Sequence, residues 1–283
     1  MPRFHRSVFP EFRVFTFCIL AGLLFTTCRQ KVKTNAVKLF TLLSSNETGI
    51  DFINELVFDE KFNIYTYRNF YNGGGVALGD INNDGLTDIF FTANMQPNRL
   101  YLNLGNFHFK DITSSSGIIK KSKWSTGVSM ADVNGDGLLD IYVCNSGDVK
   151  GDHKKNELYI NDGNLHFTEK GEKYGLADQG YSTHASFFDF DRDGDLDMFL
   201  LNNSFKLIGS FNLQQNERNN RDSSGGHKFF RNDGNHFVDI SAAAGIYGSA
   251  IGFGLGVTVG DVDNDGGMDI YVSNDFLKEI ICT

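Results

Sequence analysis

Asp132-Val-Asn134-Gly-Asp136-Gly137-Leu-Leu-Asp140 is an acidic nine-residue segment whose pattern the chain carries four times. Asp or Asn stands at loop positions 1, 3, 5 and 9, and Gly stands at position 6. Oxygen ligands and a turn residue in this spacing are what a hard dication such as Ca²⁺ requires. One such loop alone is also typical of an ordinary acidic surface turn. Four copies in one local context predict a repeat protein whose units each hold a metal ion.

The predicted ligands in each loop are the side chains at positions 1, 3, 5 and 9 and the backbone carbonyl at position 7, which the Gly turn allows to join them. Three or four carboxylates within nine residues repel one another unless a cation lies among them. We therefore expect up to four Ca²⁺ ions. The predicted ligand residues are Asp80, Asn82, Asp84, Leu86 and Asp88; Asp132, Asn134, Asp136, Leu138 and Asp140; Asp189, Asp191, Asp193, Asp195 and Asp197; and Asp261, Asp263, Asp265, Gly267 and Asp269.

The segments on either side of the loops exclude an EF-hand. That motif needs a bidentate Glu at position 12 and a helix on each side. The residues at position 12 are Phe91, Val143, Leu200 and Val272, and none of them can bind a metal. The segments before the loops alternate apolar and small residues, and those after the loops are β-branched and aromatic. Each loop is therefore predicted to join two strands.

A second phrase recurs between the loops, beginning at Arg99, Glu157 and Lys228. It predicts two short strands around a Gly-containing turn. The first aspartates of successive loops are 52, 57 and 72 residues apart, and a period near 50 with four strands per unit is typical of propeller blades. The polar segments 150–155 and 216–226 are expected to be loops inserted within blades.

The loops and their flanking strands resemble the FG-GAP/VCBS repeats of integrin-α-type β-propellers, over roughly residues 70–276. The resemblance implies that loop oxygens hold Ca²⁺ at the rim of each blade. Residues 124–132 and 251–257 look most similar to bacterial VCBS-repeat lipoproteins that carry a C-terminal ASPIC/UnbV domain. Such motifs are specific for fold and poorly specific for activity.

Two features depart from that family. His184 stands where the other units have glycine, at Gly75, Gly127 and Gly256, and a lone histidine there is expected to be a packed or surface residue and not a ligand. The family would continue beyond Phe276 into another hairpin, whereas this chain ends at Thr283. Four loops provide about four blades, and the relatives usually close a ring of seven. We therefore expect an all-β, incomplete seven-bladed propeller from a truncated reading frame, with an unpaired edge that favours aggregation.

The N-terminus has the pattern of a targeting segment. Arg3, Arg6 and Arg13 precede an apolar run over 14–25 that is too short to span a bilayer comfortably. The following Phe25-Thr-Thr-Cys28 resembles a relaxed lipobox, which implies lipidation of Cys28. Thr27 departs from the usual Gly, Ala or Ser, so plain cleavage or retention stays an alternative. The protein is predicted to be exported, as an outer-membrane lipoprotein or at the cell surface, with the periplasm as the other compartment.

These patterns give the predicted domain organisation. Residues 1–27 are a signal peptide of lipoprotein type, residues 28–60 a linker and leading strand, and residues 61–283 the propeller repeats. Strands are expected at 49–53 and 63–67. The four Cys do not form a disulfide framework, because two lie in or next to the signal.

The charge and the motifs of the chain limit the classes of function that it can have. The net charge is −9, but 14 of the 35 acidic residues are Asp side chains in the metal loops. No basic stripe indicates nucleic acid, so contact with a membrane is expected only through the lipid anchor. The chain has no Gly-x-Ser-x-Gly, His-Glu-x-x-His or phosphate-loop motif, and its 7 His are scattered without zinc-ligand spacing.

The sequence therefore favours a non-enzymatic, calcium-stabilised propeller that binds a protein or a glycan at the bacterial cell surface. The alternative is the propeller part of a calcium-dependent, lyase-like polysaccharide-degrading enzyme, in which the metal would acidify a uronate. That alternative predicts a metal with open coordination positions in a basic, aromatic-lined cleft. A third reading is a scaffold whose activity lies in other segments.

Overall fold

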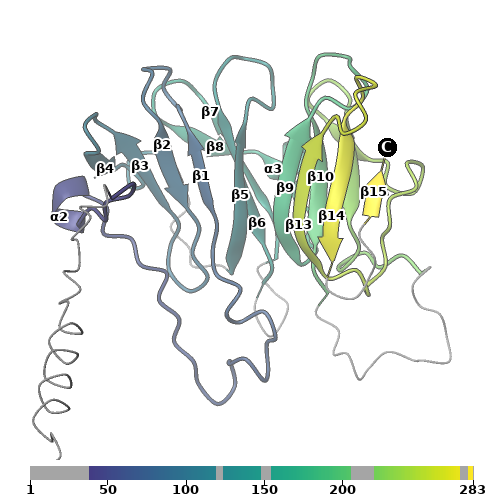
Figure 1. The fold of residues 1–283 in the computed structure, drawn as a ribbon, viewed down its shortest axis with the longest axis horizontal. Helices are drawn as coiled ribbons and strands as arrows, with labels where there is room; N and C mark the ends of the chain where they lie inside the picture. Colours follow the sequence, from purple (N-terminus) through teal and green to yellow (C-terminus); the bar gives the residue numbers. More distant parts are fainter. Residues whose placement is uncertain (1–37, 119–123, 148–153, 205–219, 275–279, 283) are drawn as a thin grey trace, which may run out of the picture. The chain divides into compact units, whose positions relative to one another are not determined.

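The computed structural model describes residues 38–118, 124–147, 154–204, 220–274 and 280–282 (Figure 1). The chain divides into two compact units, residues 1–42 and 43–283. Only 38–42 of the first unit are described, and they contain no helix or strand. The predicted signal peptide and the lipidation site Cys28 lie outside the described residues. Every described helix and strand belongs to the second unit.

The second unit contains four antiparallel sheets, each built from strands that are consecutive in the chain. We call them blades one to four (Figure 1). Blade one is β1 (Val76–Gly79), β2 (Asp88–Phe91), β3 (Arg99–Asn103) and β4 (Phe109–Asp111); blade two is β5 (Ser125–Ala131), β6 (Asp140–Asn145), β7 (Glu157–Asn161) and β8 (Phe167–Glu169); blade three is β9 (Ser182–Phe188), β10 (Asp197–Asn202), β11 (Lys228–Asn232) and β12 (Phe237–Asp239); blade four is β13 (Gly254–Gly260), β14 (Asp269–Asn274) and β15 (Ile280–Cys282). The short helices α2 (Ser45–Thr48) and α3 (Gly171–Tyr174) precede blade one and connect blade two to blade three. The predicted all-β class and four-stranded propeller-type units are confirmed.

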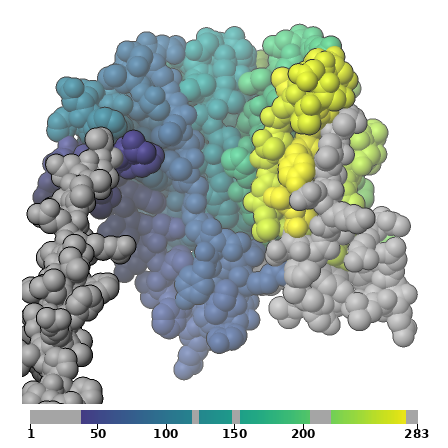
Figure 2. All heavy atoms as spheres, viewed as in Figure 1, coloured from purple at the N-terminus to yellow at the C-terminus, as the bar shows by residue number. Residues whose placement is uncertain are grey.

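The first strands of the blades, β1, β5, β9 and β13, lie beside one another in chain order. We call them the inner strands. In the space-filling view the atoms of successive blades are in contact from blade one to blade four (Figure 2). Thr126 links two such contacts, because its carbonyl accepts from the hydroxyl of Thr92 while its own hydroxyl donates to the carbonyl of Ser182 at 2.6 Å.

The second strands of the middle blades are apolar on both faces, because each lies between two neighbours. In β6, Ile141 and Val143 pack in the cluster between blades one and two, whereas Tyr142 and Cys144 pack in the cluster between blades two and three. In β10, Met198 and Leu200 face blade two while Phe199 and Leu201 face blade four. Alternate side chains of a strand point to opposite faces, so one strand contributes to two cores. Each such side chain contributes about 1.5–3 kcal/mol by burial.

Residues 50–56 cover the outer face of blade one. Phe52 stacks on Phe91 with ring centroids 4.8 Å apart, and Asp51 accepts a 2.8 Å hydrogen bond from the hydroxyl of Tyr101. The side chain of Asn54 exchanges hydrogen bonds with Asn94, at 2.9 and 3.0 Å. The segment before the first repeat is thus attached to the apolar face of blade one that blade two does not cover.

The two strands expected in this leading segment are wrong. Residues 49–53 are irregular after α2, and 63–67 form turns. The cause is local side-chain capping, in which Asn63 donates to the carbonyl of Asp59 at 2.7 Å and accepts from the backbone N–H of Tyr65 at 2.9 Å. Such bonds compete with strand pairing. Tyr67 packs instead in an aromatic cluster with Trp124, and Arg68 lies 4.2 Å from the ring centroid of Phe253 in the segment that leads into blade four.

The tail also differs from expectation. A further hairpin was not expected after Phe276, but Ile280–Cys282 forms β15 and pairs antiparallel with β14, with Ile270 opposite Cys282. Consecutive isoleucines favour an extended backbone, which gives β14 a second hydrogen-bonded neighbour.

Glycines in the inner strands allow neighbouring blades to approach closely. A Cβ atom at Gly127 would overlap the carbonyl oxygen of Thr183 and lie 3.0 Å from Nδ1 of His184. We therefore expect Gly127→Ala to lower the free energy of unfolding by about 1–3 kcal/mol, as overpacking does. Gly260→Ala is the matched control, because a Cβ at this inner-strand glycine meets no atom within 4 Å. Equal urea midpoints for the two variants would contradict the close approach.

Candidate functional site

The four acidic loops lie at the same end of the blades, each between an inner strand and the second strand (upper edge of Figure 1). The first aspartate follows directly after the inner strand, and the last aspartate is the first residue of the second strand. The predicted arrangement of strand, loop and strand is confirmed, and no helix flanks any of the four loops.

Two residues in each loop have left-handed backbone conformation. Position 6 is glycine with φ between 83° and 96° in every copy, at Gly85, Gly137, Gly194 and Gly266. Position 4 has φ between 57° and 72°, at Asn83, Gly135, Arg192 and Asn264. Asn and Gly adopt this region most readily. These two reversals turn the nine residues back on themselves, which brings the backbone N–H groups of positions 5 and 6 to the side chain at position 1.

The carboxylate at position 1 holds this turn. Asp132 accepts hydrogen bonds from the backbone N–H groups of Asp136 at 3.0 Å and Gly137 at 2.8 Å. Asp80 and Asp261 make the same pair of bonds in the first and fourth loops. The loop is therefore folded by its own side chains before any ion is considered.

The carboxylate at position 9 is buried and anchors the loop to the sheet. In blade two, Asp140 accepts from the N–H of Val133 at 3.0 Å with one oxygen and from the N–H of Asn161 at 2.8 Å with the other. Asp88 and Asp197 repeat both bonds, and Asp269 repeats the first. One side chain thus joins the loop, the second strand and the third strand.

Burial acts on the protonation of these carboxylates. Desolvation raises the pKa of Asp140 and of Asp197 to about 6, against the hydrogen bonds from two backbone N–H groups that lower it. The neighbouring loop aspartates raise it further. Desolvation also raises the pKa of Asp88. A cation in the loop would favour the ionised form of each group.

An asparagine in the third strand completes the anchor and was not predicted as a site residue. Besides its N–H bond to Asp140, Asn161 donates from its side chain to the carbonyl of Leu139 at 3.2 Å. Asn103 and Asn232 occupy the same place in blades one and three. The signal was present in the sequence, because an Asn recurs at this point of each hairpin phrase.

The third loop gathers the most carboxylate. Oxygens of Asp189, Asp191 and Asp197 lie within 4.8 Å of one another. Oδ1 of Asp189 is buried and accepts no hydrogen bond from the described part of the chain. A buried carboxylate oxygen without a partner is costly. An oxygen-rich donor set with one unpaired buried oxygen fits a hard cation such as Ca²⁺.

The other loops bring their predicted ligands together to different degrees. In the fourth loop, oxygens of Asp261, Asp263 and Asp265 also lie within 4.8 Å of one another. In the second, the amide of Asn134 donates to Asp136 at 2.9 Å, and the first loop has the same bond between Asn82 and Asp84. The position 7 residues (Leu86, Leu138, Asp195 and Gly267) each donate their backbone N–H to the position 5 carboxylate.

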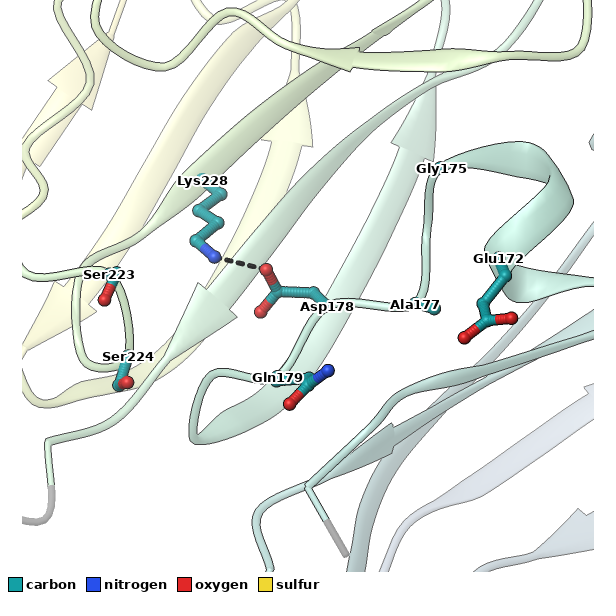
Figure 3. A pocket seen from close by; sticks show the side chains of 8 residues that line it. All are labelled: Glu172, Gly175, Ala177, Asp178, Gln179, Ser223, Ser224 and Lys228. Atoms are coloured by element: carbon teal, nitrogen blue, oxygen red, sulfur yellow. Dashed lines mark hydrogen bonds and ion pairs between the residues drawn. The ribbon is translucent and has the colours of Figure 1, made fainter.

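Two hollows are lined by residues of the second unit. One of about 530 Å³ lies between the segment before β9 and the start of β11, and its Asp178 forms an ion pair with Lys228 (Figure 3). The other, of about 380 Å³, is lined by residues at or near the start of all four inner strands. We call it the axial pocket. Among the residues described, none of the helices has the length and apolar character that a membrane span requires.

The anchor and the metal ligands are separable by mutation in metal-free protein. Asp140→Ala leaves two buried N–H groups without acceptors, which should cost about 2–5 kcal/mol of unfolding free energy in EDTA. Asp136→Ala, in the exposed part of the same loop, should cost less than about 1 kcal/mol under the same conditions. Chemical denaturation measures both. Similar losses for the two variants would contradict the anchoring role of position 9.

Known proteins share this pattern. Residues 80–143 and 145–200 match the FG-GAP-like repeat family. Cartilage acidic protein 1 of Xenopus tropicalis is 28% identical over 239 residues, which cover 84% of this chain and 33% of the relative. The proteins of the same name from Mus musculus and Homo sapiens are 29% and 28% identical, over 71% and 72% of this chain and 29% and 28% of the relatives.

The chain spans about a third of the length of the curated relatives that it matches. Their organisms leave the bacterial lipoprotein type a prediction. The two matched segments contain the first three acidic loops together with β2 to β5 and β7 to β9. Residues 80–200 thus resemble FG-GAP-like repeats in sequence, and the strands around them fold as propeller-type blades.

Proposed function

We propose that this protein is an exported, calcium-stabilised β-propeller module that binds a protein or a glycan at the bacterial cell surface and is not an enzyme. The observation that carries the proposal is the set of four loops folded by their own carboxylates, with the unpaired buried oxygen of Asp189 in the third. Each loop would hold Ca²⁺ by the side chains at positions 1, 3, 5 and 9 and the carbonyl at position 7. The ion would neutralise carboxylates that otherwise repel one another.

The proposed compartment rests on the N-terminal sequence. The basic, apolar and small-residue pattern over 1–28 is that of an export signal, with Cys28 as the site of a lipid anchor. Outside the cell, even sites with Kd values on the order of 10⁻⁴–10⁻³ M would be filled with Ca²⁺. Metal would then stabilise a chain that has no disulfide framework.

The placement of the loops favours binding over the lyase-like alternative. A metal that takes part in uronate chemistry has to reach the substrate, yet the axial pocket lies at the opposite end of the inner strands from the loops. The seven residues of β9 separate these ends by about 20 Å. Ca²⁺ in the loops is therefore proposed to act on stability, and the ends of the strands away from the metal to carry the ligand.

Calcium should raise the stability of the protein strongly. Free metal at 100 times Kd stabilises the folded state by about 2.7 kcal/mol for each site that binds only folded protein. Scanning calorimetry in excess Ca²⁺ and in EDTA measures the shift. Mg²⁺ at the same concentration should give a smaller shift, because it dehydrates reluctantly and demands near-octahedral geometry. Identical transitions in Ca²⁺ and EDTA would refute the calcium sites.

Calcium affinity should fall as the solution becomes acidic. The raised pKa of Asp140 and Asp197, about 6, means that roughly nine in ten of these groups are protonated at pH 5 and ionised at pH 7. The apparent Kd of the second and third loops should therefore weaken about tenfold from pH 7 to pH 5. In EDTA the stability of the protein should instead fall as the pH rises through 6. A carboxyl group whose pKa is raised in the folded state stabilises that state only while it is protonated. Calorimetric titration at both pH values tests this, and a pH-independent Kd contradicts it.

A further inference from the structure

The axial pocket has contributions from all four inner strands. Gly75, Gly127 and Gly254 expose backbone to it from blades one, two and four, and His184 lines it from blade three. Its volume of about 380 Å³ is in the range of small-molecule sites. The pocket therefore lies where a ligand would contact several blades at once.

His184 interrupts the repeat at this pocket. Five residues before the first loop aspartate, blades one, two and four have glycine, at Gly75, Gly127 and Gly256. The ring of His184 packs beside Gly127, where a Cβ would lie 3.0 Å from Nδ1. The inner strand thus tolerates glycine at this position in three blades, and blade three places an imidazole there. Packing alone does not explain why an imidazole stands at this pocket position when glycine suffices in the other blades.

Two side chains in the pocket have unused hydrogen-bonding capacity. Neither the imidazole of His184 nor the carboxamide of Asn72 forms a hydrogen bond with the described part of the chain. Asn203, by contrast, is used, because it donates to the carbonyl of Gly254 at 3.3 Å and accepts from Arg68 at 3.4 Å. A neutral imidazole and a carboxamide each offer both a donor and an acceptor.

The lining favours an uncharged ligand. None of the described residues that line the pocket is Asp, Glu, Lys or Arg. Burial lowers the pKa of His184, which favours the neutral form of the ring. The larger hollow differs, because its Asp178 and Lys228 neutralise each other in an ion pair (Figure 3). Hydroxyl groups both donate and accept hydrogen bonds, which matches the two unused side chains.

We propose that the axial pocket binds an uncharged sugar residue, with His184 and Asn72 hydrogen-bonded to its hydroxyl groups. The glycine backbone of the neighbouring inner strands would contact the C–H face of the sugar ring. This inference rests on the proposed binding function and names its ligand class and its place. A charged sugar would be disfavoured, because no cationic side chain of a described residue lines the pocket and the nearby Arg68 already donates to Asn203 and to the carbonyl of Ser204.

Calcium-saturated full chain provides the test. Methyl α-mannoside, methyl β-galactoside and methyl β-N-acetylglucosaminide are titrated by calorimetry, with methyl β-glucuronide as the charged comparator. At least one neutral glycoside should bind with a Kd on the order of 1 mM, at least tenfold more tightly than the glucuronide. The imidazole ¹⁵N signals of His184 should shift on binding.

His184→Gly restores the residue of the other three blades and should weaken that glycoside about tenfold or more, as should Asn72→Ala. His108→Ala, in an exposed hairpin turn of blade one, should leave the affinity unchanged. Absence of neutral glycoside binding by protein that unfolds cooperatively, or full affinity in His184→Gly, would overturn the axial site. If the protein captures a surface protein or glycan and His184→Gly does not affect this capture, the binding function stands and this pocket is rejected. If the unfolding transition does not change with Ca²⁺, the proposed function itself is rejected.

Discussion

A buried carboxylate at the end of each acidic loop is the contact on which each blade depends. Asp140 joins Val133 of the loop to Asn161 of the third strand while lying itself at the start of the second strand. A charge in the interior is tolerated only when its hydrogen bonds are made and a counter-charge is near. The backbone N–H groups meet the first condition. A cation among the exposed aspartates of the loop would meet the second, and metal binding and blade folding would then be coupled through one side chain.

The blades are joined by a different physical device. Each middle blade presents alternate residues of one strand to two neighbours, so the hydrophobic clusters share strands without sharing side chains. Hydrogen bonds through Thr126 and the glycine contact at Gly127 bring the inner strands together at the end remote from the metal loops. The loops therefore stabilise one end of each blade while the inner strands are left to shape a pocket at the other. In the proposed function, stability and recognition lie at opposite ends of the same strands.

Repetition made most of this predictable. The loops, the strands on both sides and the hairpins follow from period-two patterning and from turn residues. The loop pattern recurs four times and the hairpin phrase three times, which makes a chance match improbable. Local features without a repeat were not predictable. Residues 49–53 and 63–67 have strand-like composition, but Asn63 satisfies nearby backbone groups and Phe52 stacks on Phe91, and neither residue belongs to a repeated phrase of the sequence. The anchoring role of Asn161 could have been inferred from its recurrence, whereas its partner Asp140 was assigned to the metal alone.

Crystals grown with CaCl₂ and measured for the anomalous signal of calcium would test the coupling of metal to anchor most directly. Four peaks are predicted, one in each loop, bounded by the oxygens of positions 1, 3, 5 and 7, with the position 9 carboxylate facing the ion and still accepting its backbone N–H bonds. Loops without calcium, or ions held with Asp140 and its counterparts turned away from those N–H groups, would contradict the view that one buried carboxylate links each ion to its blade.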